Sequence, residues 1–160
     1  MQVRVWSLMV VFLATAQLGG VAPNSPEDLD SFWAEVSRTV GEGDFEGYSA
    51  TYHPDAVLVN AISGSSYPIA DALAGWKQGF VDTAAGDMSA GVVFRFTQRL
   101  SNETTAHETG MFRYSSQTQG AEPSVSLIHF EALLVNKGGW KMVMEYQKSP
   151  ATQAEWDAAQ

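Results

Sequence analysis

Apolar side chains recur every three to four residues along the first half of the chain, the period of a helix that packs one face on a core. One such stretch covers 29–40 and follows a Ser-Pro pair at 25–26 that favours a helix start. The pattern predicts a second, short helix after Asp44 and, beyond a turn, a third over 69–84. A brief β-prone segment, 56–60, separates the last two helices.

The second half of the chain has the pattern of strands. Four long segments rich in Val, Phe, Thr and Tyr are separated by Asn, Gly, Ser and Pro. They cover 91–100, 105–116, 125–136 and 139–148. Helices followed by a meander of strands predict an α+β fold. A length of 160 residues, 45% of them hydrophobic, suits a single domain.

The first 22 residues form a separate segment. A basic Arg4, an apolar stretch over 5–14 and a small-residue site at Ala16 are typical of a secretory signal peptide. We expect 1–22 to be a signal peptide and linker, cut after Ala16 or Ala22. The protein is then secreted or periplasmic, without a stable membrane anchor. The alternative is an apolar arm that packs on the domain.

Composition and charge narrow the choice of partners. The formal net charge is −9 and no two of the nine Lys and Arg residues are adjacent, so nucleic acid is not an expected partner. Cysteine is absent and the three histidines lack metal-ligand spacing, so no metal is expected. The sequence has no Gly-rich phosphate loop and no dinucleotide fingerprint, so we expect no cofactor.

Two segments carry a resemblance to a known superfamily. They are GDFEGYSATYHPDAVLVN, 43–60, and the closing KGGWKMVMEYQKS, 137–149. Together with the element order they resemble SnoaL-like members of the nuclear transport factor 2-like superfamily over 25–149, with 150–160 as a surface tail or a final helical turn. The resemblance implies a cone: a curved, mostly antiparallel sheet wrapped around about three N-terminal helices, with an internal pocket. It also implies a homodimer through the sheet.

His129 and Glu131 stand two residues apart in a predicted strand and therefore share one face. A two- or four-residue hairpin loop would place Glu131 opposite Met144 and His129 opposite Tyr146. A three-residue bulged loop would instead place Glu131 opposite Glu145. We expect the first register. The resemblance implies that these side chains then point into the pocket.

A histidine and a carboxylate on one face can act as a proton-transfer pair. They can equally face solvent or form an inert polar patch. The sequence departs from the relatives by having Met144 and Tyr146 where histidines are frequent, and Glu131 where the association domain of calcium/calmodulin-dependent kinases has a basic residue. A carboxylate in that place favours a neutral or cationic ligand over an anionic one.

Other candidate residues lie on the predicted helices and turns. Asp55, close to His53, is a second acid-base candidate or an ordinary turn residue. Tyr48, Tyr52 and Trp76 are expected to be core residues or, in a cone fold, ligand contacts. On a later strand, His107 and Glu108 face opposite sides, and the pattern does not decide which is buried.

The sequence thus predicts a protein that binds a small, largely apolar, neutral ligand, with Tyr48, Tyr52, Trp76, Met144 and Tyr146 as contacts. An alternative is an acid-base enzyme resembling isomerases, dehydratases or cyclases. In it, Glu131 or Asp55 would take a proton, and His129 or Tyr146 would donate one. A second alternative is a module that only mediates oligomerisation.

Overall fold

The computed structural model describes residues 26–159 and contains helices and strands in the order α1, α2, β1, β2, α3, β3–β6, α4. Their bounds are α1 Pro26–Glu42, α2 Phe45–Ala50, β1 Tyr52–Asn60, β2 Ser65–Pro68, α3 Ile69–Ala85, β3 Met88–Ser101, β4 Thr105–Thr118, β5 Ser124–Asn136, β6 Trp140–Pro150 and α4 Gln153–Ala158. The predicted signal peptide and linker, 1–22, lie outside the described residues. No helix in 26–159 is long and apolar enough to cross a membrane.

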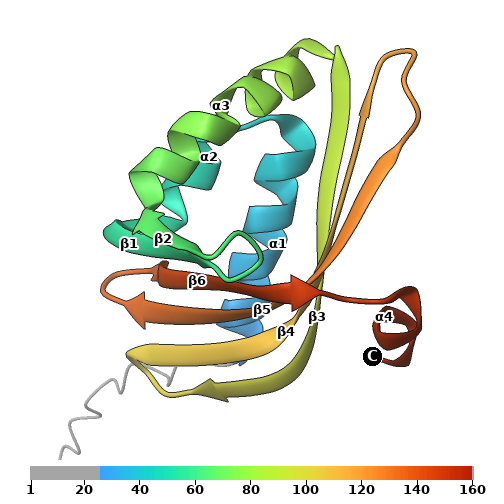
Figure 1. Cartoon of the computed structure of the whole chain (residues 1–160). Helices are drawn as coiled ribbons and strands as arrows, with labels where there is room; N and C mark the ends of the chain where they lie inside the picture. The colour runs from blue at the N-terminus through green and yellow to red at the C-terminus, as the bar shows by residue number, and fades with distance from the viewer. Residues whose placement is uncertain (1–25, 160) are drawn as a thin grey trace, which may run out of the picture.

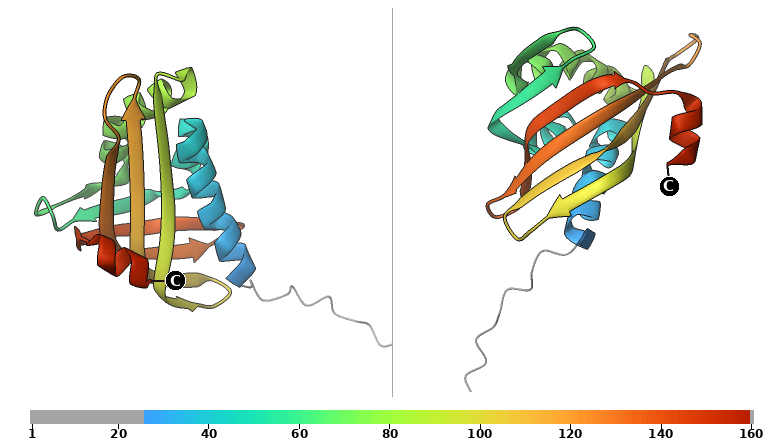
Figure 2. Two further views of the ribbon diagram at one scale, coloured as in Figure 1. Left: turned by 90° about the vertical axis from the view of Figure 1, so that its right-hand side faces the viewer. Right: turned by 60° about the horizontal axis from the view of Figure 1, so that its bottom comes forward.

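The six strands form one open sheet in the order β2-β1-β6-β5-β4-β3. All neighbouring strands are antiparallel except β1 and β6, which run parallel. The sheet curves around α1, α2 and α3, whereas α4 lies on its other side (Figures 1 and 2). We call the side that faces α1–α3 the inner face and the opposite side the outer face. The predicted α+β fold, a curved and mostly antiparallel sheet around three helices, is confirmed.

The predicted boundaries differ from the structure around the second helix. The apolar spacing that predicts this helix includes Tyr52, but the helix ends at Ala50 and Tyr52 is the first residue of β1, four residues before the β-prone segment 56–60. The expected turn before the third helix contains β2, which pairs antiparallel with β1. Pairing with neighbours, which local sequence does not encode, extends β1 and orders β2.

The core lies between α1 and the inner face of the sheet. Trp33 of α1 occupies its centre, with its ring 4.5 Å from Phe94, 5.2 Å from Phe96 and 5.7 Å from Phe130 between centroids. Buried aromatic rings at such distances combine hydrophobic burial with favourable edge-to-face contacts. They anchor α1 to β3 and β5 and leave space further along the inner face.

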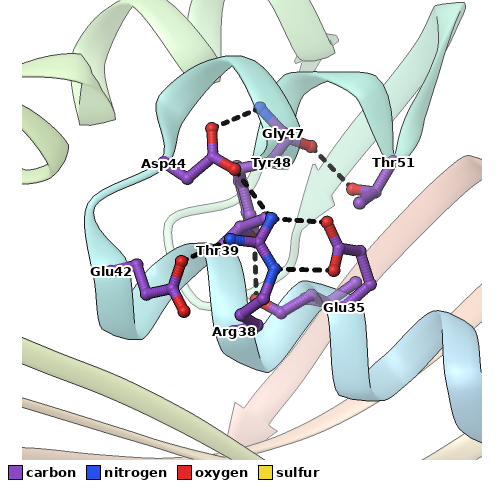
Figure 3. A network of polar contacts seen from close by, with 9 residues as sticks. Glu35, Arg38, Thr39, Glu42, Asp44, Gly47, Tyr48 and Thr51 are labelled. Carbon is purple, nitrogen blue, oxygen red and sulfur yellow. Dashed lines mark hydrogen bonds and ion pairs between the residues drawn. The ribbon is translucent and has the colours of Figure 1, made fainter.

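A polar network fixes α2 against α1 (Figure 3). Arg38 of α1 forms ion pairs with Glu35 at 2.6 Å and with Asp44 at 2.7 Å. Asp44 also caps α2, because its Oδ1 accepts a hydrogen bond from the Gly47 amide at 2.8 Å. The network sets the direction in which α2 leaves the turn, and so positions Tyr48.

The predicted C-terminal tail, 150–160, contains α4. Thr152 and Glu155 form a reciprocal capping box at its start. Trp156 is buried on the outer face, where the guanidinium of Arg95 lies 4.5 Å from its ring centroid. The helix α4 therefore packs on the outer face of the sheet through Trp156.

Candidate functional site

A cavity of about 500 Å³ lies between the helices and the inner face of the sheet. Its walls are largely apolar. Trp33 comes from α1, Trp76 and Phe80 from α3, and Phe94 and Phe112 from the sheet. Pockets that bind small molecules have this range of volume and this kind of lining, with a few converging polar groups.

The polar groups gather where α2, β1 and β6 meet. The Tyr52 hydroxyl donates to Glu145 Oε2 at 2.5 Å, and the Tyr48 and Tyr52 hydroxyl oxygens are 3.2 Å apart. Gln147 Nε2 donates to Glu145 Oε1 at 2.8 Å, and Gln147 Oε1 accepts from Asn60 Nδ2 at 3.2 Å. Tyr48, Tyr52, Glu145 and Gln147 all line the cavity. The cavity therefore has one polar end organised around a carboxylate.

All donors in this network point towards Glu145. The single hydroxyl proton of Tyr52 is used in its bond to the carboxylate, so Tyr48 must donate to Tyr52. On the other side Asn60 donates to Gln147, which donates to Glu145. Each carboxylate oxygen thus accepts a hydrogen bond at the end of a chain of donors, an arrangement that suits an ionised carboxylate.

Burial shifts the pKa values at this end of the cavity. The side chain of Glu145 is buried, and burial raises its pKa above the ordinary 4.5, against the hydrogen bonds from Tyr52 and Gln147, which lower it. Burial, and then the negative charge of Glu145, raise the pKa values of Tyr52 and Tyr48. Both tyrosines are therefore neutral hydroxyls, and Glu145 is the group that changes charge.

Three of the five predicted ligand contacts line the cavity: Tyr48, Tyr52 and Trp76. Met144 and Tyr146 are not among its lining residues. Along β6, Met142 and Glu145 line the cavity, whereas Met144 and Tyr146 pair with Leu133 and Glu131 on the outer face.

The predicted register of His129 and Glu131 is wrong. Glu131 lies opposite Tyr146, and His129 lies opposite Ser149. The hairpin loop has three residues, because Asn136 pairs with Trp140. Two bulges in β6 then shift the pairing further, and each bulge reverses which face the next residues occupy. In β5, Phe130 and Ala132 are buried on the inner face, so the alternating residues His129 and Glu131 lie on the outer face, and neither lines the cavity.

On the outer face, Glu131 and His129 each contact side chains that can carry the opposite charge. Glu131 lies 2.6 Å from Lys148 Nζ and 3.3 Å from His107 Nε2, and the hydrogen bond from Lys148 lowers its pKa. His129 Nε2 is 3.4 Å from Glu155 of α4. The predicted proton-transfer pair, His129 and Glu131, therefore lies outside the pocket.

Asp55, the second acid-base candidate, is on the surface of β1. Its side chain is 93% exposed and lies 3.8 Å from His53 Nδ1. It is not among the residues that line the cavity. Within 26–159, no group of three or more His, Cys, Asp or Glu residues is placed to hold a metal ion.

Glu145 and Gln147 line the cavity but are not among the candidate residues that the sequence pattern predicts. The three-residue loop that the sequence left open is the one observed, but without a bulge it places Glu145 opposite Glu131, whereas the structure pairs Glu145 with Ala132 on the inner face. Val143, which has no partner in β5, forms the bulge that turns Glu145, and Gln147 after it, to the inner face.

A second charged network lies under the ring of Trp33. Glu108 is fully buried on the inner face and accepts hydrogen bonds from Trp33 Nε1 and Arg99 Nε. Arg99 also forms an ion pair with Asp30 of α1. The choice that the sequence left open between His107 and Glu108 is settled, with Glu108 inside. Trp33 links this network to the cavity wall.

Comparison with known proteins rests on structure. No family model matches the sequence, and no curated protein matches it either. A protein of unknown function from Shewanella oneidensis, described as NTF-2 like, superposes with a TM-score of 0.58 at 14% identity, over 76% of this chain and 96% of that chain. The chain has the nuclear transport factor 2-like fold.

Proteins with very different names share this nuclear transport factor 2-like fold. The beta subunit of a benzoate 1,2-dioxygenase from Burkholderia mallei superposes with a TM-score of 0.63 at 16% identity, over 77% of this chain and 89% of that chain. A ketosteroid isomerase-like protein from Erwinia carotovora atroseptica gives 0.56 at 11% identity, over 79% and 95%. At such identities the likeness shows the fold, so function must be argued from the site.

Replacing Glu145 by glutamine should change how stability depends on pH. Because the pKa of Glu145 is raised by burial, the folded state binds its proton more tightly than the unfolded state does. The stability of the natural protein relative to E145Q should therefore fall as pH rises above 4.5 and level off once pH exceeds the raised pKa. Urea unfolding of both proteins between about pH 4 and pH 8 measures this difference. A difference that is constant, or that grows with pH, would contradict the assignment.

Proposed function

We propose that the protein binds a small, largely apolar molecule in the inner-face cavity, with a polar group of that molecule at the Glu145 end. The observation that carries the proposal is the combination of a cavity of about 500 Å³, aromatic walls and one converging polar network. Binding buries the apolar part of the ligand, which supplies affinity, whereas the polar end orients it.

A neutral fluorescent dye tests this proposal. N-phenyl-1-naphthylamine fluoresces strongly in apolar sites and should bind with a large gain in emission. Gly79 of α3 lines the cavity, and a Cβ added there would lie 3.4 Å from the terminal carbon of Met88, another lining residue. The variant G79L should therefore fill part of the space and lower dye affinity at least about tenfold, which corresponds to about 1.4 kcal/mol.

The matched control is A74L on the same helix. Ala74 is exposed and is not a lining residue, so the same leucine should leave dye affinity unchanged. Dye binding that G79L and A74L affect equally would contradict binding in the cavity. Absence of dye binding by the natural protein would contradict the proposed function itself.

A second candidate function is acid-base catalysis by Glu145. A buried carboxylate with a raised pKa beside an apolar cavity is a suitable general base. It would take a proton from the carbon next to a carbonyl, leaving the electron pair in an enolate, and return a proton to that carbon. Support comes from the likeness to a protein named ketosteroid isomerase-like.

Exchange of carbon-bound hydrogen tests this second function without knowledge of the substrate. Cyclohexanone in heavy water should exchange its α-hydrogens faster with the natural protein than with E145Q, as followed by NMR. Equal rates for the two proteins would leave ligand binding as the function and remove catalysis by Glu145.

We also propose a homodimer through the outer face of the sheet. Among the described residues, five large apolar side chains are exposed on that face: Val57, Val93, Leu100, Val125 and Leu133. Exposed apolar patches of this kind often mark protein interfaces. Sedimentation should give a dimer that L133K converts to a monomer, and a monomer at all concentrations would contradict the proposal.

A further inference from the structure

Of the cavity-lining residues that the structure describes, only Glu145 has a side chain that carries a formal charge. The residue is buried, with 8% of its surface exposed. Among the described residues, no Lys, Arg or His nitrogen forms an ion pair with it. By contrast, Glu108, the other buried carboxylate of the described residues, is paired with Arg99. A buried carboxylate without a positive partner is costly when ionised.

The hydrogen-bond chains nevertheless stabilise Glu145 as an anion. Tyr52 donates to one of its oxygens and Gln147 to the other, and each of these donors is itself held by a further donor, Tyr48 and Asn60. These hydrogen bonds satisfy an anion but supply no net positive charge. Both oxygens of the Glu145 carboxylate therefore have a hydrogen-bond donor, but among the described residues the carboxylate has no positively charged partner.

Aromatic rings surround the same end of the cavity. The ring of Tyr48 is 5.6 Å from Tyr52, 6.2 Å from Trp76 and 4.9 Å from Phe80 between centroids. All four residues line the cavity. The faces of aromatic rings attract cations, most strongly where water is excluded, and such cages recognise substituted ammonium groups.

We propose that the ligand is a hydrophobic organic cation, a tertiary or quaternary amine whose ammonium group lies between the Tyr48 ring and the Glu145 carboxylate. Its apolar part would fill the space beside Phe94 and Phe112. This inference rests on the proposed function and specifies the ligand class of the same site. Alkyl groups on nitrogen lower the desolvation penalty of the cation, which suits an apolar cavity better than a metal ion or a primary ammonium does. The net charge of −9 also concentrates cations around the molecule.

Two compounds of the same shape test the charge preference. Phenyltrimethylammonium and tert-butylbenzene differ only in a positively charged nitrogen in place of a carbon. Each is titrated against the protein with N-phenyl-1-naphthylamine bound, and displacement of the dye is measured. The cation should displace the dye at a concentration at least about tenfold lower than the neutral compound, which corresponds to about 1.4 kcal/mol.

Two variants assign the preference to the residues named. E145Q keeps the shape of the side chain and removes the charge, so the preference for the cation should fall to less than about twofold. W76L removes one ring and should weaken binding of the cation more than binding of tert-butylbenzene. The two variants are independent, so W76L still tests the inference if E145Q does not fold.

The outcomes separate this inference from the proposed function. If the dye binds and the neutral compound displaces it as well as the cation does, or better, the inference is overturned while ligand binding stands. A preference that both E145Q and W76L retain also overturns it. If neither the dye nor either compound binds, both the inference and the proposed function fail.

Discussion

Replacing Arg99 by leucine is expected to lower the free energy of unfolding by about 3–5 kcal/mol, because removing one partner of a buried ion pair leaves an uncompensated charge. Glu108 is 0% exposed, and Arg99 is the residue that pairs with its charge. Glu108 would keep the hydrogen bond from Trp33 Nε1, but the indole is uncharged and cannot replace the positive charge of the guanidinium. Urea unfolding followed by Trp fluorescence measures the change.

The double variant R99L/E108L isolates the reason for this loss. Removing both charges together should recover most of the stability, since well-packed apolar replacements of buried ion pairs are often neutral or stabilising. K148M is the surface control, because it breaks the outer-face pair between Lys148 and Glu131, whose side chains are 41% and 23% exposed. It should change stability by less than about 1 kcal/mol. Equal losses in R99L and R99L/E108L would show that packing of Arg99, and not its charge, stabilises the fold.

Replacing Gly110 by alanine should also have a large effect. We expect it to lower the free energy of unfolding by at least about 3 kcal/mol. Gly110 lies in β4 opposite Phe96, where β3 contains a bulge. A Cβ at this position would lie 2.1 Å from the Arg95 carbonyl oxygen and 2.9 Å from the Phe96 Cα. Both obstacles belong to the backbone of the neighbouring strand, so the two strands would have to separate to accommodate the methyl group.

The control for G110A is the same substitution at Gly91 of β3. There a Cβ would lie 3.7 Å from the Ser115 hydroxyl oxygen, an ordinary contact distance. G91A should therefore change the free energy of unfolding by no more than about 0.5 kcal/mol. Thermal or urea unfolding of the two variants compares them directly. If G110A were as stable as G91A, the close approach of β3 and β4 would not be a determinant of the curved sheet.

The sequence predicted the elements of this fold well, because their signals are local. The apolar period of three to four residues over 29–40 and 69–84 corresponds to α1 and α3. The four strand-like segments correspond to β3–β6. The resemblance then supplied what local patterns could not, namely the curvature and the inner pocket.

The inner face of β6 could not be predicted from alternation. A regular strand would have placed Met142 and Met144 on one face, but the bulge at Val143 brings Met142 and Glu145 to the inner face. The bulge brings Glu145 to the inner face in place of Met144, whereas His129 and Glu131 lie on the outer face because their neighbours Phe130 and Ala132 are buried on the inner one. The helix side of the site, with Tyr48 and Trp76, was predicted because helical period contains no such ambiguity.

Indole NMR signals test the central claim, that a ligand occupies the inner-face cavity, most directly. Trp33 and Trp76 line this cavity, whereas Trp140 and Trp156 do not. In a titration with N-phenyl-1-naphthylamine, assigned ¹H–¹⁵N indole resonances should shift for Trp33 and Trp76 and stay fixed for Trp140 and Trp156. Shifts confined to Trp140 or Trp156, with Trp33 and Trp76 unchanged at saturation, would place the ligand elsewhere and contradict the account.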